Sequence, residues 1–223
     1  MQYLIGILLN RKPLKPNFLL QNMNTRELIH EIKHHIPFTT AATIIAIVAV
    51  YAINYYFQIN ISTGAFEVLH PLHITVSSIV AGAIFYKYKP KIIPAILVAL
   101  SGSILIGSLS DIILPWLGGN LFGLSTSFHL PLFEEPLVII SASLLGAIIG
   151  ISTKITKIPH LLHVGISVFA SLFYLLAFSQ FFNASYFILA LVIVLIAVVI
   201  PCCISDILYP FFFLNEKIKH CNC

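Results

Sequence analysis

The sequence predicts an all-α integral membrane protein, with six transmembrane helices in two inverted three-helix repeats and both termini in the cytoplasm. Three observations support this prediction. Of the 223 residues, 59% are hydrophobic and only 9% are charged, whereas a soluble domain carries about 25% charged residues. The basic residues are confined to alternate segments between the apolar runs. Short polar motifs also recur in the same order in both halves of the chain.

Six apolar segments are predicted to cross the bilayer, because a helix needs about 20 apolar residues to do so. Polar or basic stretches such as KYKPK and TKITK separate them. The second and fourth segments are short, which tilt or partial burial in the bundle would accommodate. The predicted spans cover residues 37–57, 70–86, 94–116, 135–152, 160–180 and 187–212.

Lysine and arginine predict the orientation of these spans. They lie before the first span, between the second and third, between the fourth and fifth, and after the sixth. With the N-terminus inside, all 12 basic residues are cytoplasmic, in agreement with the positive-inside rule. The net charge of +4 therefore reports topology and gives no indication of nucleic-acid binding. The predicted location is the plasma (cytoplasmic) membrane.

Two polar motifs recur along the chain. HPLHITVS at residues 70–77 matches HLLHVGIS at 160–167, and SLSDIILP at 108–115 matches CISDILYP at 203–210. A weaker match pairs HEIKHHIP at 30–37 with HLPLFEEP at 129–136. Repeats of three spans must have opposite orientations, as in many secondary transporters. The predicted units are a cytoplasmic N-terminal segment (1–36), a first repeat (37–116), a second, inverted repeat (129–212) and a cytoplasmic tail (213–223).

The recurring polar residues predict a metal-binding cluster towards each membrane face. Histidines at i and i+3 share a helix face, and the helix N-terminus favours the neutral form that ligates metals. Each aspartate precedes a proline by four residues, and that proline cannot bond the aspartate carbonyl. A carboxylate at membrane depth also requires a nearby cation. The predicted ligands are His70, His73, Asp111, Glu134 and Glu135 towards the outer face, and His160, His163, Asp206 and His35 towards the inner face.

Mixed imidazole and carboxylate ligands favour a divalent transition metal (Zn, Mn, Fe, Co or Ni) over Ca or Mg. The metal would be the transported substrate or a bound ion, and Cys202 and Cys203 would make the inner cluster softer. We therefore expect a small secondary transporter or permease for such a cation. Protonation of the ligands competes with metal binding and offers a means of coupling to protons.

Other functions remain open at this stage. A His/Asp zinc site with Glu134 or Glu135 as general base would serve an intramembrane hydrolase of lipids or peptides. The HExxH motif is absent, however, and one site on each face suits a transporter better than an enzyme. A proton or ion channel could use the same histidines, and in a structural protein the polar groups would only pair helices. The expected partners are the lipid bilayer and a metal ion, and six short spans would suit a homodimer.

Overall fold

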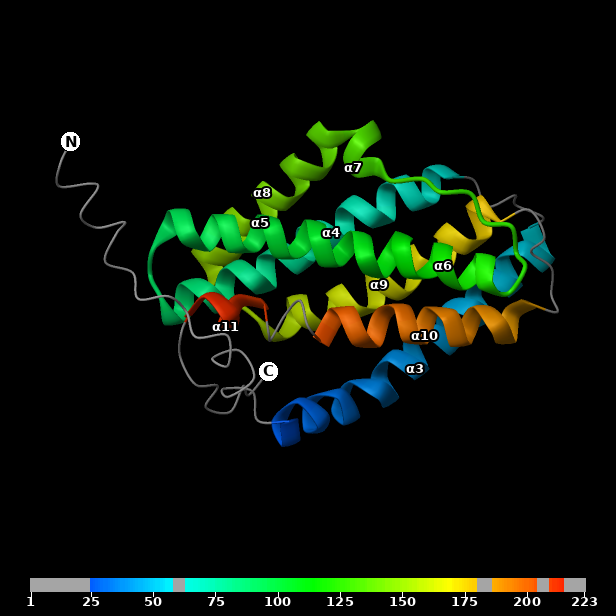
Figure 1. Ribbon diagram of the computed structural model, residues 1–223, viewed down its shortest axis with the longest axis horizontal. Helices are drawn as coiled ribbons and strands as arrows, with labels where there is room; N and C mark the ends of the chain where they lie inside the picture. Colours follow the sequence, from blue (N-terminus) through cyan, green and yellow to red (C-terminus); the bar gives the residue numbers. More distant parts are fainter. Residues whose placement is uncertain (1–24, 58–62, 180–185, 204–208, 215–223) are drawn as a thin grey trace.

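A computed structural model describes residues 25–57, 63–179, 186–203 and 209–214 of the chain. Helices make up nearly all of these residues, and the described part contains no strand beyond an isolated antiparallel bridge between Thr126 and Ser179. The all-α prediction is confirmed. Figure 1 shows the long helices packed side by side as a bundle.

The first half of the chain forms three long rods. The first two are α3 (Thr25–Phe57) and α4 (Thr63–Tyr88). The third rod consists of α5 (Ile92–Ser108), the π-helical segment η1 (Leu109–Ile113) and α6 (Leu114–Leu121), which follow one another without a break.

The second half begins with the short helix α7 (Pro131–Glu134) and continues with α8 (Pro136–Thr153) and α9 (Lys157–Phe178). It ends with α10 (Phe187–Cys203) and the short α11 (Tyr209–Leu214). The described residues of each predicted segment are therefore largely helical. Within the described residues, three helices, Thr63–Tyr88, Ile92–Leu121 and Pro136–Thr153, are long and apolar enough to cross a membrane, which indicates membrane association.

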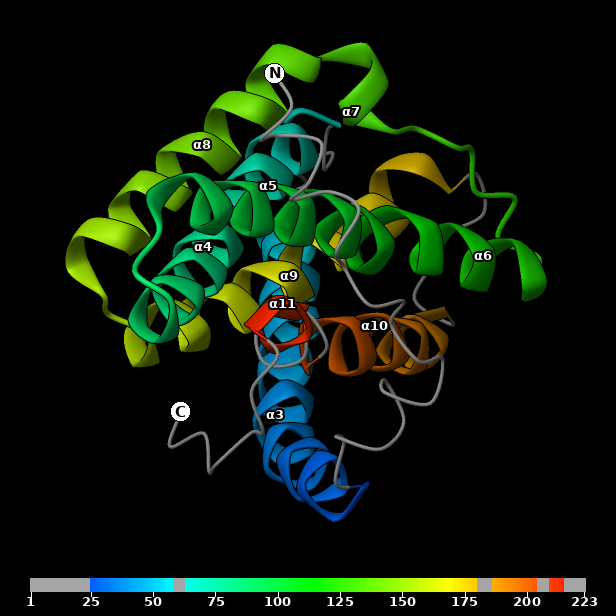
Figure 2. The ribbon, with the colours of Figure 1, turned by 60° about the vertical axis from the view of Figure 1, so that its left-hand side comes forward.

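The rods alternate in direction along the chain. In Figure 1, α3, the α5–α6 rod and α9 run from left to right, whereas α4, α8 and α10 run from right to left. Figure 2 gives a second view of the same arrangement. Helix α4 is central and packs against α5, α8 and α9. Its antiparallel contact with α9 brings together the two helices that carry the HxLH motifs.

Two apolar cores flank the contact between α4 and α9. One is formed by α3, α9 and α10 and includes Ala46, Val168 and Val194. The other is formed by α4, α5 and α8 and includes Ala81, Ala99 and Ala147. The motif residues His70, His73, Asp111 and His163 are buried rather than on the surface of the bundle.

Small residues fix the position of α4 against α8. Gly146 and Gly150 lie one turn apart on α8, and a Cβ atom at either would collide with a backbone carbonyl oxygen of α4, that of Thr75 or Ile79 respectively. This G-x-x-x-G spacing allows two helix backbones to approach closely within a membrane. The close contact holds α4 in one register, and α4 carries two of the histidines.

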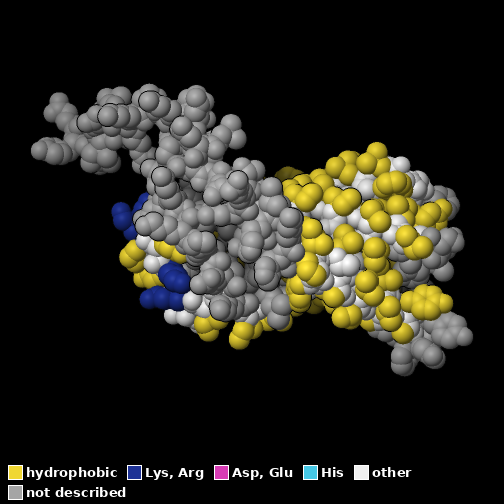
Figure 3. Space-filling view, turned by 90° about the horizontal axis from the view of Figure 1, so that it is seen from below, with side chains coloured by type: hydrophobic (Ala, Val, Ile, Leu, Met, Phe, Trp, Pro, Cys, Tyr) yellow, Lys and Arg dark blue, Asp and Glu magenta, His cyan; other side chains and the backbone are white. Residues whose placement is uncertain are grey.

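The outer surface of the bundle is apolar. Figure 3 shows hydrophobic side chains over much of the visible face. Large aliphatic residues are strongly exposed, for example Leu137 and Ile188, each 80% exposed. Apolar patches of this extent on a monomer mark contact with another molecule or a membrane. The exposed aliphatic residues therefore agree with a lipid-facing surface.

Basic residues gather at one end of the molecule. Lys87, Lys89 and Lys91 surround the connection between α4 and α5, and Lys154 follows α8. The Lys154 Nζ lies 5.5 Å from the centroid of the Tyr86 ring, so both connections are at the same end. Basic side chains are visible at the left of Figure 3.

Candidate metal centre

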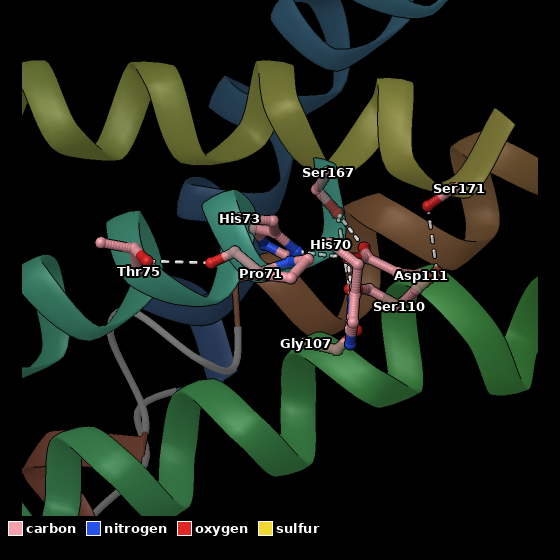
Figure 4. A network of polar contacts seen from close by, with 9 residues as sticks. All are labelled: His70, Pro71, His73, Thr75, Gly107, Ser110, Asp111, Ser167 and Ser171. Atoms are coloured by element: carbon pink, nitrogen blue, oxygen red, sulfur yellow. Dashed lines mark hydrogen bonds and ion pairs between the residues drawn. The ribbon is translucent and has the colours of Figure 1, made fainter. Parts of the chain in front are cut away.

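A buried polar cluster lies where α4, η1 and α9 meet (Figure 4). Helix α4 contributes His70 and His73, η1 contributes Asp111, and α9 contributes Ser167. These side chains are at most 1% exposed. The i, i+3 spacing of the histidines places both rings towards the same carboxylate, as the sequence predicts.

The cluster lies deeper than the sequence predicts. Helix α4 begins at Thr63, seven residues before His70, and the rod containing Asp111 continues for ten residues to Leu121. At 1.5 Å per residue these are distances of about 10 and 15 Å. The expectation that the helix N-terminus acts on His70 and His73 is therefore wrong, because the effect is confined to the terminal turn. Polar residues such as Glu67 extend the helices beyond the apolar runs.

Asp111 accepts four hydrogen bonds. Its Oδ2 lies 2.8 Å from His70 Nδ1 and 2.6 Å from His73 Nδ1. Its Oδ1 accepts from Ser110 Oγ at 2.9 Å and from Ser167 Oγ at 3.0 Å. A carboxylate offers about four lone-pair sites and no donor. An ionised Asp111 is thus saturated, and both histidines direct an Nδ1–H towards it.

This hydrogen bonding decides which imidazole nitrogens can bind a metal. A neutral imidazole that is protonated on Nδ1 has its lone pair on Nε2. The Nε2 atoms of His70 and His73 are both buried, and neither has a hydrogen-bond partner among the described residues. Ligand atoms of His70, His73 and Asp111 lie within 4.8 Å of one another and could hold an ion. The hydrogen bonds favour the Nε2 atoms as ligands, with Asp111 orienting them, an arrangement common at metal sites.

The π-helical segment changes which carbonyl Pro115 leaves unbonded. The sequence predicts that this is the carbonyl of the aspartate, four residues earlier. The N–H of Leu114 bonds the carbonyl of Leu109, five residues back, and Pro115 has no N–H to continue this register to the Ser110 carbonyl. Ser171 Oγ donates to that carbonyl at 3.1 Å instead. The π turn thus leaves the Ser110 carbonyl free to accept the Ser171 hydrogen bond, which joins η1 to α9.

His163 and Cys202 adjoin the same cluster. The ring centroids of His73 and His163 are 4.5 Å apart. Ligand atoms of His73, His163 and Cys202 lie within 4.8 Å of one another, and all three residues are buried. The sequence predicts His163 in a separate cluster at the inner face. The structure corrects this, because α4 and α9 contact each other at their HxLH motifs.

Glu134 and Glu135 line a separate cleft of about 40 Å³ near the start of α8. Glu134 is 56% exposed, and its Oε1 lies 3.0 Å from His129 Nδ1. The two glutamates were predicted to join His70, His73 and Asp111. They are instead grouped with other residues around the cleft: Glu67, Pro71, His129, Pro131, Val138 and Ile139.

Phe66 lies between this cleft and the buried cluster. Its ring stacks on His70 with a centroid distance of 5.4 Å and meets the ring of His129, edge to face, at 6.1 Å. Phe66 is fully buried. Tyr174 positions His129 on the other side, because its Oη accepts a hydrogen bond from the His129 backbone N–H at 3.2 Å.

Three predicted ligands cannot be placed. Asp206 lies outside the described residues, and so do the side chains of His35 and His160. Two serines that contact the cluster were not predicted, Ser167 and Ser171. Ser167 is the last residue of the repeated HxLH motif, four residues after its second histidine. That spacing puts Ser167 on the histidine face of α9 and could have identified it.

Comparisons of the chain with protein-family models, with curated proteins and with solved structures find no match.

Proposed function

We propose that the protein is a small secondary transporter for a divalent transition-metal cation. The observation that carries the proposal is the pair of buried Nε2 atoms on His70 and His73, held in place by Asp111. Leaving a buried polar atom unpaired costs about 1–3 kcal/mol. Two such atoms, on histidines bonded to the same carboxylate, are candidates for a ligand, and neutral imidazole nitrogens bind transition metals.

The acidic cleft supports a route by which a cation enters. Glu67, Glu134 and Glu135 line it, and a cleft lined by one sign of charge concentrates the opposite ion. Pro71, within α4, has no N–H for the carbonyl of Glu67, so a backbone oxygen is added to the acidic groups. Phe66 would then act as the barrier between this entrance and the histidines.

The arrangement of the helices supports alternating access. In the predicted repeat, α4 corresponds to α9, and α3 to α8. The two apolar cores agree with this correspondence. Helices α4, α5 and α8 form one core, and their counterparts α9, α10 and α3 form the other. His73 and His163 are equivalent positions in the repeat and lie next to each other. Rocking of one core against the other would expose the histidines to each side in turn.

The distribution of charge supports the proposed orientation. Glu67, at the cleft, and Lys87, at the basic end, are 20 residues apart on α4, or about 30 Å. This matches the thickness of the hydrocarbon core. The basic end would face the cytoplasm of a cell bounded by its plasma membrane, and the acidic cleft would face outwards.

The hydrolase alternative receives less support from the contacts. Ser110 and Ser167 donate to Asp111, and the acidic candidates for a general base, Glu134 and Glu135, belong to the cleft on the far side of Phe66. A hydrolase would need a base beside the metal-bound water.

Uptake of Zn²⁺ into proteoliposomes tests the proposal. We expect the wild type to transport Zn²⁺ and the double variant His70→Ala/His73→Ala to lose transport. The matched control is Ser78→Ala, which alters an equally buried residue on the same helix, bonded to the Ser143 carbonyl at 2.7 Å, and should retain transport. Zn²⁺ bound by the wild type without any flux would contradict the transporter proposal and favour an enzyme.

A further inference from the structure

We propose that His73, His163 and Cys202 form a second, thiolate-containing position for the transported cation, adjoining the first and sharing His73 with it. This inference rests on the proposed function and narrows its substrate class to cations that accept sulfur ligands. Zn²⁺, Co²⁺ and Cd²⁺ belong to this class, whereas Mg²⁺ and Ca²⁺ prefer oxygen ligands.

The geometry of the three residues suits one ion. They come from three helices, α4, α9 and α10. Their ligand atoms lie within 4.8 Å of one another, and they are 1%, 1% and 3% exposed, respectively. His73 Nδ1 is bonded to Asp111, and the unpartnered Nε2 is left as its donor to a metal. A site of this kind is enclosed by protein.

The two repeats differ at the position of the thiol, which is a cysteine in the second half and a glycine in the first. The SDxxxP motifs are 95 residues apart, so Cys202 corresponds to Gly107. A Cβ atom at Gly107 would lie 3.9 Å from the His73 ring. The position equivalent to the cysteine therefore also faces a motif histidine, but it carries no side chain. The first half presents imidazole nitrogens, and the second adds sulfur.

Because both positions use His73, they cannot hold an ion at the same time. With its Nδ1–H held by Asp111, His73 has one lone pair to offer. An ion bound with His70 can pass to His163 and Cys202 by exchanging partners around His73. Binding to the thiol displaces its proton, because the thiolate is the form that ligates metal. The two positions would thus bind the cation one after the other in the middle of the bundle.

Cobalt spectroscopy on the full-length chain in lipid nanodiscs tests the inference. In a variant that keeps Cys202 alone (Cys203→Ser/Cys221→Ser/Cys223→Ser), Co²⁺ should give a near-ultraviolet sulfur-to-cobalt charge-transfer band. Adding Cys202→Ser should remove this band and preserve the visible ligand-field bands of imidazole-bound Co²⁺. Adding His163→Ala to the Cys202-only chain should weaken the band, while Ser143→Ala, elsewhere in the bundle, should leave it unchanged.

The outcomes separate this inference from the proposed function. Ligand-field bands without a charge-transfer band in the Cys202-only variant would overturn the thiolate position and leave the transporter proposal standing. If Co²⁺ gives no bands with any variant, and Zn²⁺ is not transported, both fail. A charge-transfer band that persists after Cys202→Ser would also overturn the inference.

Discussion

At the scale of single residues, Asp111 has the central role in the site. It accepts hydrogen bonds from both motif histidines and from two serines, on two other helices besides its own. Four donors stabilise the charged carboxylate without a metal. The sequence predicts Asp111 as a metal ligand, and its contacts suit a second role, in which it orients the two imidazoles that we propose as ligands.

Replacing Asp111 by asparagine tests this role. The amide cannot accept as many hydrogen bonds, so the two imidazoles lose their fixed tautomer and orientation. Loss of such a supporting group lowers metal affinity by about 10- to 100-fold. We expect a decrease of this size for Zn²⁺ in calorimetric titration of Asp111→Asn, with weak binding retained. Binding that is abolished as completely as in His70→Ala/His73→Ala would identify Asp111 as a direct ligand.

Phe66 provides a second test at this scale. It separates the acidic cleft from His70, and truncation to alanine would open a path between them. We expect Phe66→Ala to raise the rate of Zn²⁺ exchange with the buried cluster, measured by chelator competition. The variant should also unfold more easily, because removal of a buried phenylalanine costs about 3–5 kcal/mol. An unchanged exchange rate in folded Phe66→Ala would argue against entry on this side.

At the scale of helices, the contact between α4 and α8 determines where the histidines lie. Gly146 has no room for a side chain, because a Cβ there would meet the Thr75 carbonyl oxygen and the Ser78 side chain. At Gly165 on α9, no described residue comes within 4 Å of such an atom. The packing of the helices therefore requires a glycine at position 146 but not at position 165.

Alanine substitution of these two glycines should have opposite effects. Gly146→Ala forces α8 away from α4, and overpacking of this kind costs about 1–3 kcal/mol. Gly165→Ala should be neutral or stabilising by up to about 1 kcal/mol, because alanine favours the helix. Unfolding in a graded denaturing detergent measures both. Equal stability of the two variants would contradict the described packing of α8.

The helices also show which features could be predicted from sequence. The HxLH spacing is local, so it correctly predicts that His70 and His73 share a face. The start of α4 could not be predicted, because the helix continues through the charged Glu67 back to Thr63. The π turn at Leu109–Ile113 has no signal beyond Pro115. The contact between His73 and His163 depends on how α4 and α9 pack, which no local pattern encodes.

At the scale of the whole molecule, the distribution of charged residues and the predicted repeat agree with the same arrangement of helices. Acidic residues line a cleft near one end of α4, basic residues lie at its other end, and many large aliphatic side chains of the bundle are exposed. The six-span topology and the cytoplasmic termini remain predictions. The equivalence of the two cores is what an inverted repeat requires, although the residues that would complete the second copy of the site, Asp206 among them, lie outside the described part.

Labelling from each side of the membrane tests this arrangement. In a chain without native cysteines, Lys91→Cys and Glu134→Cys place a thiol at the basic end and at the acidic cleft, where both residues are exposed. We expect an impermeant maleimide added to intact cells to label Glu134→Cys alone. Lys91→Cys should react only after the cells are opened. Labelling of both from outside would contradict the proposed orientation.

The central claim is that the Nε2 atoms of His70 and His73 bind a transition metal within the bundle. X-ray absorption at the zinc edge of the Zn²⁺-loaded, full-length protein tests it most directly. We expect imidazole nitrogens in the coordination shell of the wild type, and fewer of them, with weaker binding, in His70→Ala/His73→Ala. A shell of oxygen atoms only, unchanged by that double substitution, would contradict it.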